Sequence, residues 1–140
     1  MTENSMTTKY SFKVEKLIRD KVPEIIDQEI GVSITYTVLE NDDYIASLKD
    51  KLVEESHEVI SAGNIEEIVD ELADLMEVIN ALTETLGISH ADVQKTMENR
   101  KAGRGGFSSK IYCHSIAVTE ENKERLAYYR ERPLKYPEMS

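Results

Sequence analysis

Two short acidic motifs lie near the middle of the chain and carry its strongest chemical signal. Glu55-x-x-Glu58 is followed, after an interval of 12 residues, by Glu71-x-x-Asp74. A single acidic residue on a helix is usually solvated, because charged side chains are mostly exposed. Four carboxylates beside apolar side chains are a different case, since like charges repel and the burial of charge is costly. A hard divalent cation such as Mg²⁺ or Mn²⁺ relieves this repulsion through oxygen ligands alone.

Two predicted helices position these motifs. Apolar residues recur at three- and four-residue spacing on both sides of a turn-like segment at 61–64, and neither side contains proline. Within this segment Gly63 fits a position just after one helix, Asn64 fits the N-cap of the next, and Glu67 completes a capping box. The sequence therefore predicts an antiparallel helical pair.

The helical repeat of about 100° per residue places the carboxylates at the edges of two apolar stripes. The first stripe comprises Ile45, Leu48, Leu52 and Val59, and the second comprises Ile68, Leu72, Leu75, Val78 and Ile79. Glu55 lies on the flank of the first stripe, and Glu71 lies within the second. A turn near 64–65 sets 55–58 opposite 71–74. The predicted ligands of one metal site are Glu55, Glu58, Glu71 and Asp74.

The motifs resemble a known family. Glu54-Glu55-x-x-Glu58 followed by Glu71-x-x-Asp74 is similar to the signature of the all-α nucleotide pyrophosphohydrolases related to MazG. Three further segments, 10–23, 42–58 and 104–107, resemble a branch of short, single-domain MazG-like proteins, which is also related to phosphoribosyl-ATP pyrophosphohydrolase. The resemblance covers residues 10–115 and depends on the combination, since a lone E-x-x-E motif carries no information.

The resemblance implies a function. The expected reaction is Mg²⁺-dependent hydrolysis of a nucleoside triphosphate between the α- and β-phosphorus, which yields a monophosphate and pyrophosphate and could clean the nucleotide pool. Glu55 is the preferred base for the attacking water. Phosphoribosyl-ATP and dUTP are alternative substrates. A non-catalytic acidic helical module that binds a partner is the alternative from a different class.

Several basic or polar residues become candidate substrate contacts through this resemblance. Lys95 and Asn99 share one helix face and match positions at which relatives contact the nucleotide. Arg104 lies in the glycine-rich segment 103–107, where backbone N–H groups could approach an anion. Arg19 and Lys21 are candidate phosphate contacts. An ordinary basic helix face, a glycine-rich connector and solvated surface charge are the respective structural alternatives.

Composition limits the class of protein. The 140 residues carry 17 basic and 27 acidic side chains, a net charge of −10, which disfavours binding to a nucleic acid polymer. One cysteine, Cys113, excludes an internal disulfide and fits a reducing compartment. No apolar run approaches the roughly 20 residues of a membrane span, and the start lacks a secretory apolar region. We therefore expect a cytoplasmic protein that does not enter a membrane.

The remaining segments complete the predicted fold, a mostly α MazG-like helical bundle with a minor β hairpin in a single domain over 1–140. Residues 1–9 are expected to be frayed, with Met6 as an alternative start. A short helix from Pro23 ends near Gly31, and alternation at 32–38 and 110–118 indicates two strands that could pair. The first motif helix begins at residue 41 or 42, Gly87 ends the second, and Ser89 caps the next.

The C-terminal extension, 116–140, lies outside the resemblance. A last helix is expected from Thr119 until Pro133, and Tyr128 and Tyr129 are expected to pack in a core or an interface. Relatives assemble as dimers or tetramers, so the resemblance implies a homodimer or homotetramer. A zinc site formed by His57, Cys113 and His114 is set aside because the ligands are poorly spaced.

Overall fold

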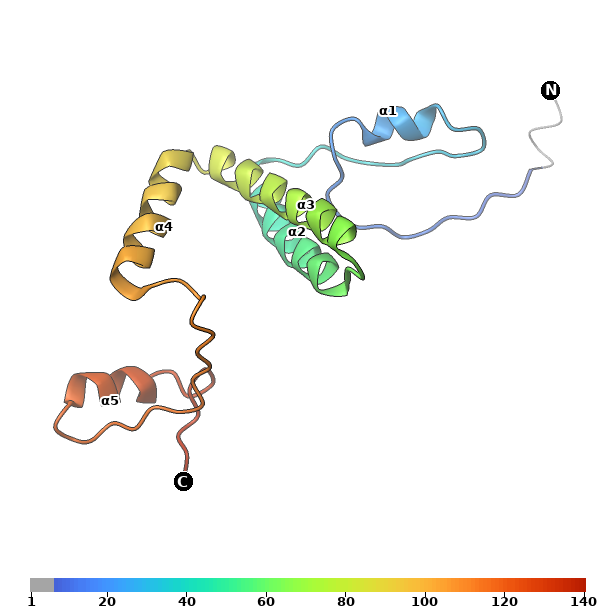
Figure 1. Ribbon diagram of the computed structural model, residues 1–140. Coiled ribbons are helices and arrows are strands. Elements are labelled where there is room, and N and C mark those ends of the chain that lie inside the picture. Colours follow the sequence, from blue (N-terminus) through green and yellow to red (C-terminus); the bar gives the residue numbers. More distant parts are fainter. Residues whose placement is uncertain (1–6) are drawn as a thin grey trace. The chain divides into compact units, whose positions relative to one another are not determined.

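The computed structural model describes residues 7–140, and all regular secondary structure in that range is helical (Figure 1). The helices are α1 (Val22–Asp27), α2 (Asn41–Ser61), α3 (Ile65–Thr85), α4 (His90–Arg104) and α5 (Lys123–Arg130). The predicted mostly α fold class is thereby confirmed. None of the described helices is long and apolar enough to cross a membrane.

The chain divides into two compact units, Met1–Asn99 and Arg100–Ser140, which are described separately. A single domain over 1–140 stays a prediction. The predicted fraying of residues 1–9 and the alternative start at Met6 fall largely on residues 1–6, outside the described residues. Residues 7–9 are exposed and lie outside any helix.

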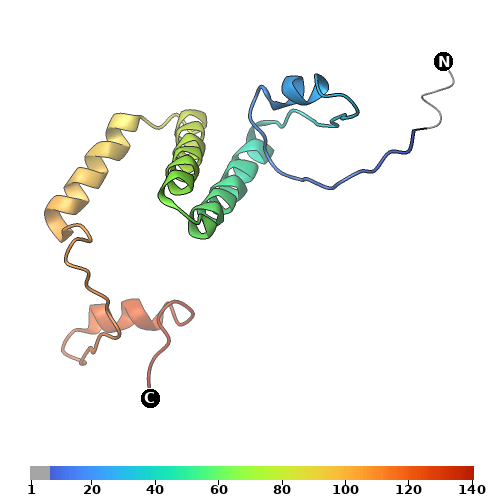
Figure 2. The same cartoon turned by 45° about the vertical axis from the view of Figure 1, so that its right-hand side comes forward.

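Helices α2 and α3 form the antiparallel hairpin that the sequence predicts, and a short turn joins them (Figures 1 and 2). Leu48 of α2 and Val78 of α3 are buried at their contact. Half-buried apolar side chains extend this contact along both helices: Ile45, Leu52, Val59, Ile68, Leu75 and Leu82. The first predicted stripe therefore faces the partner helix.

The second predicted stripe is only partly correct. Ile68, Leu75 and Val78 face α2, but Leu72 is 43% exposed and Ile79 is 39% exposed. Leu72 and Ile79 lie at the exposed edge of this stripe, next to the exposed side chains of Ile65, Val69 and Met76. At about 100° per residue the five side chains span roughly 120° of the helix, and burial is greatest at Val78, on the edge of the stripe opposite Leu72.

The turn between α2 and α3 is closed by side-chain caps. The Glu67 backbone N–H donates to Oδ1 of Asn64 at 2.9 Å, which confirms Asn64 as the N-cap. The Glu67 carboxylate accepts from the Gly63 N–H at 2.7 Å, one residue earlier than in a standard capping box. Gly63 directly follows the extended C-cap residue Ala62, as predicted, and it does so without a positive φ.

The other helix ends follow local sequence signals. Gly87 has φ +68°, a conformation that costs other residues about 1–2 kcal/mol, and it follows the end of α3. Oγ of Ser89 accepts from the Asp92 N–H at 3.4 Å at the start of α4. Helix α5 begins three residues later than predicted, because Asn122 and not Thr119 caps it.

The predicted β hairpin is absent from residues 7–140. Segments 32–38 and 110–118 both lack strand structure, and they belong to different units. A strand exists only when a neighbouring backbone satisfies its N–H and C=O groups, and periodic alternation alone supplies no such neighbour. The alternating side chains are not buried either, since Tyr36 is 56% exposed and Val38 is 87% exposed. The prediction of two strands was therefore wrong.

The C-terminal unit is organised by three tyrosines. The rings of Tyr128, Tyr129 and Tyr136 lie with centroids 5.0–6.1 Å apart. The guanidinium of Arg132 lies 4.0 Å from the centroid of the Tyr128 ring. The rings of Tyr128 and Tyr129 contact each other, but Tyr128 is 43% exposed, so a core or interface role for the two residues stays a prediction.

The N-cap of α3 gives a test of the hairpin. Asn64→Ala removes the acceptor for the Glu67 N–H and should lower the free energy of unfolding by about 1 kcal/mol. Denaturant unfolding of the full chain measures the change. Asn41→Ala is the matched control, because the start of α2 has no side-chain cap. Equal stability of Asn64→Ala and the wild type would contradict the assigned cap.

Candidate active site

Three carboxylates meet at the α2–α3 contact. Oxygen atoms of Glu55, Glu71 and Asp74 all lie within 4.8 Å of one another. Glu55 projects from α2, while Glu71 and Asp74 lie one turn apart on α3. The hairpin thus brings together three of the four predicted ligands, from both motifs.

The cluster has one buried member at its base. Glu55 is only 8% exposed, whereas Glu71 and Asp74 are half-buried. A buried carboxylate requires a compensating partner, because the transfer of charge out of water is strongly unfavourable. The ammonium of Lys51, one turn earlier on α2, lies 3.5 Å from Oε1 of Glu55 and supplies part of that compensation.

Glu58 lies at the margin of the cluster. Its side chain is exposed, and it is not among the three carboxylates whose oxygens converge. Its charge nevertheless acts on Glu71, whose pKa it helps to raise. His57, the residue before it, is also exposed.

Repulsion between the carboxylates of the cluster affects the pKa of Glu71. Partial burial raises the pKa of Glu71 above its ordinary value, and the charges of Asp74, Glu58, Glu55 and Asp70 add to this increase. A bound cation would offset these like charges. Both partial burial and the neighbouring carboxylates therefore favour the protonated form of Glu71.

Two basic residues that were not predicted lie near the cluster. Lys51 and Lys16 lie 3.1 Å and 3.2 Å from Oε1 of Glu54. Partial burial acts to raise the pKa of Glu54, but the hydrogen bonds and charges of these two lysines lower it overall. The position of Lys51, three and four residues before Glu54 and Glu55, was a usable sequence signal. Lys16 offered none.

Of the five predicted substrate contacts, one lies at the acidic cluster and four do not contact it within the described residues. Nη2 of Arg19 lies 2.7 Å from Oδ1 of Asp74, so Arg19 directly contacts the cluster. Lys21 is exposed at the N-cap of α1, and Lys95 and Asn99 are exposed on α4. Arg104 ends α4 and belongs to the C-terminal unit. Only Arg19 of these five is paired with a site carboxylate within the described residues.

The three converging carboxylates fit a hard divalent cation. Magnesium binds oxygen at about 2.0–2.1 Å, so its opposed ligand oxygens lie about 4.2 Å apart. Adjacent ligand oxygens of such an ion lie about 2.9 Å apart. The oxygens of the cluster lie within 4.8 Å of one another, so they would have to approach the ion more closely. All three donors are carboxylate oxygens, the ligand type preferred by Mg²⁺ and Mn²⁺. The donor set therefore suits such an ion after small side-chain movements.

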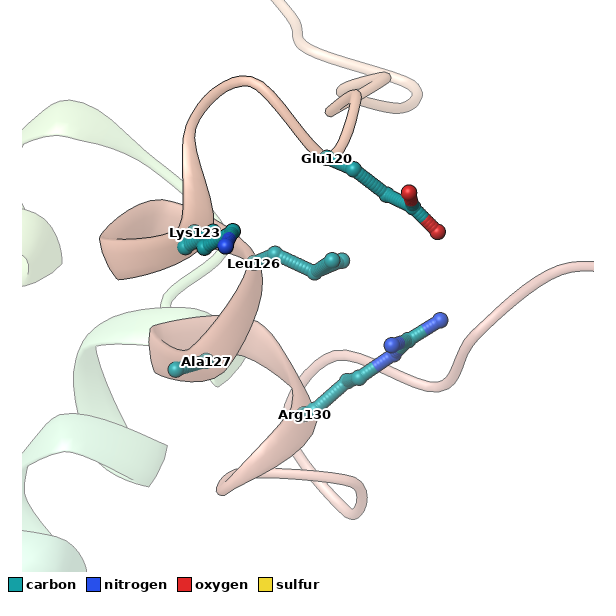
Figure 3. Close-up of a pocket in the computed structure, with 5 residues that line it drawn as sticks. All are labelled: Glu120, Lys123, Leu126, Ala127 and Arg130. Carbon is teal, nitrogen blue, oxygen red and sulfur yellow. The ribbon is translucent and has the colours of Figure 1, made fainter.

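A separate pocket lies in the C-terminal unit (Figure 3). It has a volume of about 370 Å³ and is lined by Glu120, Lys123, Leu126, Ala127 and Arg130. Nε of Arg130 is already paired with Oε1 of Glu138 at 2.8 Å. The pocket contains no cluster of acidic ligands, so we assign it no catalytic role.

The helical hairpin and its opposed acidic motifs define a class. They are typical of the MazG-like all-α nucleoside triphosphate pyrophosphohydrolases. Residues 13–101 match the family model of phosphoribosyl-ATP pyrophosphohydrolase, and the chain belongs to this family. The match contains both motifs and ends before Arg104, earlier than the resemblance over 10–115. Comparison with curated proteins and with solved structures gave no match.

The raised pKa of Glu71 predicts a pH-dependent effect in metal-free protein. A carboxyl group whose pKa is raised by folding contributes stability below its ordinary pKa of 4.5, and that contribution is lost as the pH rises through the folded value. Glu71→Gln has no such group. In chelator at pH 7 the variant should melt at the wild-type temperature or higher, and the difference should shrink towards pH 4.

Thermal unfolding at both pH values measures this effect. Glu77→Gln, at an exposed position of the same helix, is the control and should show little change between the two pH values. A lower melting temperature for Glu71→Gln than for the wild type in chelator at pH 7 would contradict the assigned repulsion.

Proposed function

We propose that this chain is a magnesium-dependent pyrophosphohydrolase that cleaves a nucleotide substrate between its α- and β-phosphorus. The observation that carries the proposal is the convergence of Glu55, Glu71 and Asp74 in a chain of this family. The family match supports pyrophosphohydrolase chemistry, and the cluster supplies acidic groups for it.

The proposed metal ligands are Glu55, Glu58, Glu71 and Asp74. Glu58 is one helical turn from Glu55 and would join the other three by a change of side-chain rotamer. When bound, Mg²⁺ or Mn²⁺ would neutralise the charge of the substrate phosphates and polarise the scissile bond. The acidic residues alone would repel a triphosphate, so the proposal requires the ion.

Glu55 is the proposed general base. It is the most buried carboxylate of the site, and Lys51 restrains it from the preceding turn. The oxygen of a water molecule attacks a phosphorus of the α–β anhydride while its proton passes to the Glu55 carboxylate. The bridging P–O bond breaks, which separates the nucleoside monophosphate from pyrophosphate.

The basic residues are proposed to hold the phosphates. Arg19 already lies at the cluster, 2.7 Å from Asp74. Lys95 and Asn99 project from a common face of α4, and Arg104 and Lys21 remain proposed contacts through the family resemblance. Arginine and lysine in these roles would stabilise the charge that develops on the leaving pyrophosphate.

The family description favours phosphoribosyl-ATP as the first substrate to test. A nucleoside triphosphate, including dUTP, presents the same α–β anhydride to the cluster and is the second candidate. The two proposals share every catalytic residue and differ only in the groups that recognise the sugar and base. A role in cleaning the nucleotide pool would follow from the second.

Product analysis tests the proposed reaction. With Mg²⁺ or Mn²⁺ the protein should release pyrophosphate from phosphoribosyl-ATP or from members of a nucleoside triphosphate panel, and chelator should abolish the activity. Glu55→Gln should lower kcat by about 10²–10⁴-fold, because it removes the general base. Glu77→Gln is the matched control and should retain activity.

Two outcomes contradict the proposal. Release of orthophosphate alone would place the cleaved bond elsewhere. Binding of Mg²⁺ and nucleotide without turnover of any compound would favour a non-catalytic acidic module.

A second proposal concerns subunit assembly and starts from the outer face of α3. Apolar side chains follow one another there at alternating spacings of four and three residues. Their exposed fractions are 75% for Ile65, 58% for Val69, 43% for Leu72, 62% for Met76 and 39% for Ile79. Because Ile68, Leu75 and Val78 face α2, helix α3 is apolar on two sides, which is typical of a helix covered by more than one neighbour.

The regular spacing favours a second copy of this chain as the partner. Residues at alternating intervals of four and three form the seam of a helical coiled coil. A two-fold axis would place this seam against itself, since a closed dimer uses the same surface on both subunits. We therefore propose a homodimer, or a homotetramer built from it, in which the α3 seam is buried.

Charge placed in the seam tests the assembly. Val69→Glu combined with Met76→Glu should reduce the solution mass to the 16.0 kDa of one chain, whereas the wild type should have at least twice that mass. Light scattering coupled to size exclusion measures both. Ile60→Glu is the control, because Ile60 is 78% exposed but belongs to α2. A monomeric wild type would contradict the proposed seam.

A further inference from the structure

The N-terminal segment is fastened to the acidic hairpin by two ion pairs. Lys16 Nζ lies 3.2 Å from Oε1 of Glu54 on α2, and Arg19 Nη2 lies 2.7 Å from Oδ1 of Asp74 on α3. Both contacts lie within the unit Met1–Asn99. Residues 10–18 have no helix or strand, so no backbone ladder joins the segment to the hairpin, and Leu17 and Ile18, between the two ion-paired residues, are half-buried.

The two ion pairs differ in their relation to the cluster. Asp74 is one of the three carboxylates whose oxygens converge, whereas Glu54 is not. The Arg19 guanidinium donates a charge-assisted hydrogen bond to Oδ1 of Asp74, one of the oxygens available to a metal. A divalent cation at the cluster would lie close to this positive group and repel it. The ion would not compete with Lys16, because Lys16 is paired with Glu54, which is outside the cluster.

We propose that Arg19 is a tethered counter-charge of the acidic cluster, and that a divalent cation displaces it from Asp74 while Lys16 keeps the segment attached to α2. The inference rests on the proposed metal site and adds a coupling between metal binding and the N-terminal segment. The released Arg19 remains three residues from its anchor and is free to bind an anionic phosphate of the substrate. Arg19 would thus pair with Asp74 in the metal-free protein and with a substrate phosphate in the substrate-bound protein.

The coupling has a fixed sign and a limited size. Because Arg19 and the metal compete for Asp74, loss of Arg19 must strengthen metal binding, and metal binding must release Arg19 by the same factor. The Arg19 side chain is 62% exposed and that of Asp74 is 41% exposed. Exposed ion pairs of this kind correspond to about a two- to fivefold change in an equilibrium constant.

The first measurement is the affinity of the full chain for Mn²⁺ and Mg²⁺ by calorimetry without nucleotide. Arg19→Gln should bind the metal about two to five times more tightly than the wild type. Lys21→Gln is the charge-matched control, since Lys21 lies two residues away and makes no ion pair among the described residues. An equal gain in both variants would reduce the effect to net charge and would overturn the inference.

The second measurement reads the Arg19 side chain directly. Trypsin cleaves after Arg19 only when its guanidinium has left Asp74 and entered the protease. Early cleavage after Arg19, relative to cleavage after the exposed Lys13, should rise about two- to fivefold when Mg²⁺ is added to wild-type protein. Cleavage after Lys16 relative to Lys13 should not change, because Glu54 lies outside the metal cluster.

The combined results separate this inference from the proposed function. If wild-type protein binds neither metal, the metal site fails and the inference fails with it. If metal binds and supports catalysis, but Arg19→Gln has wild-type affinity and the Arg19 cleavage ratio is unchanged, only the inference is overturned. Tighter binding by Arg19→Gln alone, together with metal-induced cleavage after Arg19 alone, is the expected result.

Discussion

Mutual repulsion among the carboxylates at the α2–α3 contact is the constraint on which the rest of this site depends. The hairpin requires the two helices to pack through Leu48 and Val78, and the same packing carries Glu55, Glu71 and Asp74 towards one another. Hydrophobic burial thus stabilises an arrangement that electrostatics opposes. Positive charge is the general remedy, and it can come from a metal ion or from the chain itself.

The chain supplies part of this positive charge from two directions. Lys51 approaches Glu54 and Glu55 along α2, and the N-terminal segment brings Lys16 and Arg19 from outside the hairpin. The family match, which begins at residue 13, includes this segment together with both acidic motifs. The matched residues therefore include both the basic segment and the acidic hairpin.

The predictable features are those set by local sequence. The bounds of α2 and α3, the Asn64 cap and the end of α3 before Gly87 follow from side chains a few residues apart. The convergence of Glu55 with Glu71 and Asp74 was also accessible, because a short turn fixes the register of a helical pair. The strands at 32–38 and 110–118 were wrong, since alternation does not reveal whether a pairing partner exists. Arg19 on Asp74 joins residues distant in the chain, and no local pattern encodes such a contact.

The most direct test of the account is the position of a bound metal. Crystals of the full chain grown with Mn²⁺ would locate the ion through its anomalous scattering. The account predicts a peak within bonding distance of the carboxylate oxygens of Glu55, Glu71 and Asp74, with Glu58 drawn towards it. A peak bound by other residues, or no peak at this cluster in crystals that contain Mn²⁺ elsewhere, would contradict the proposed centre.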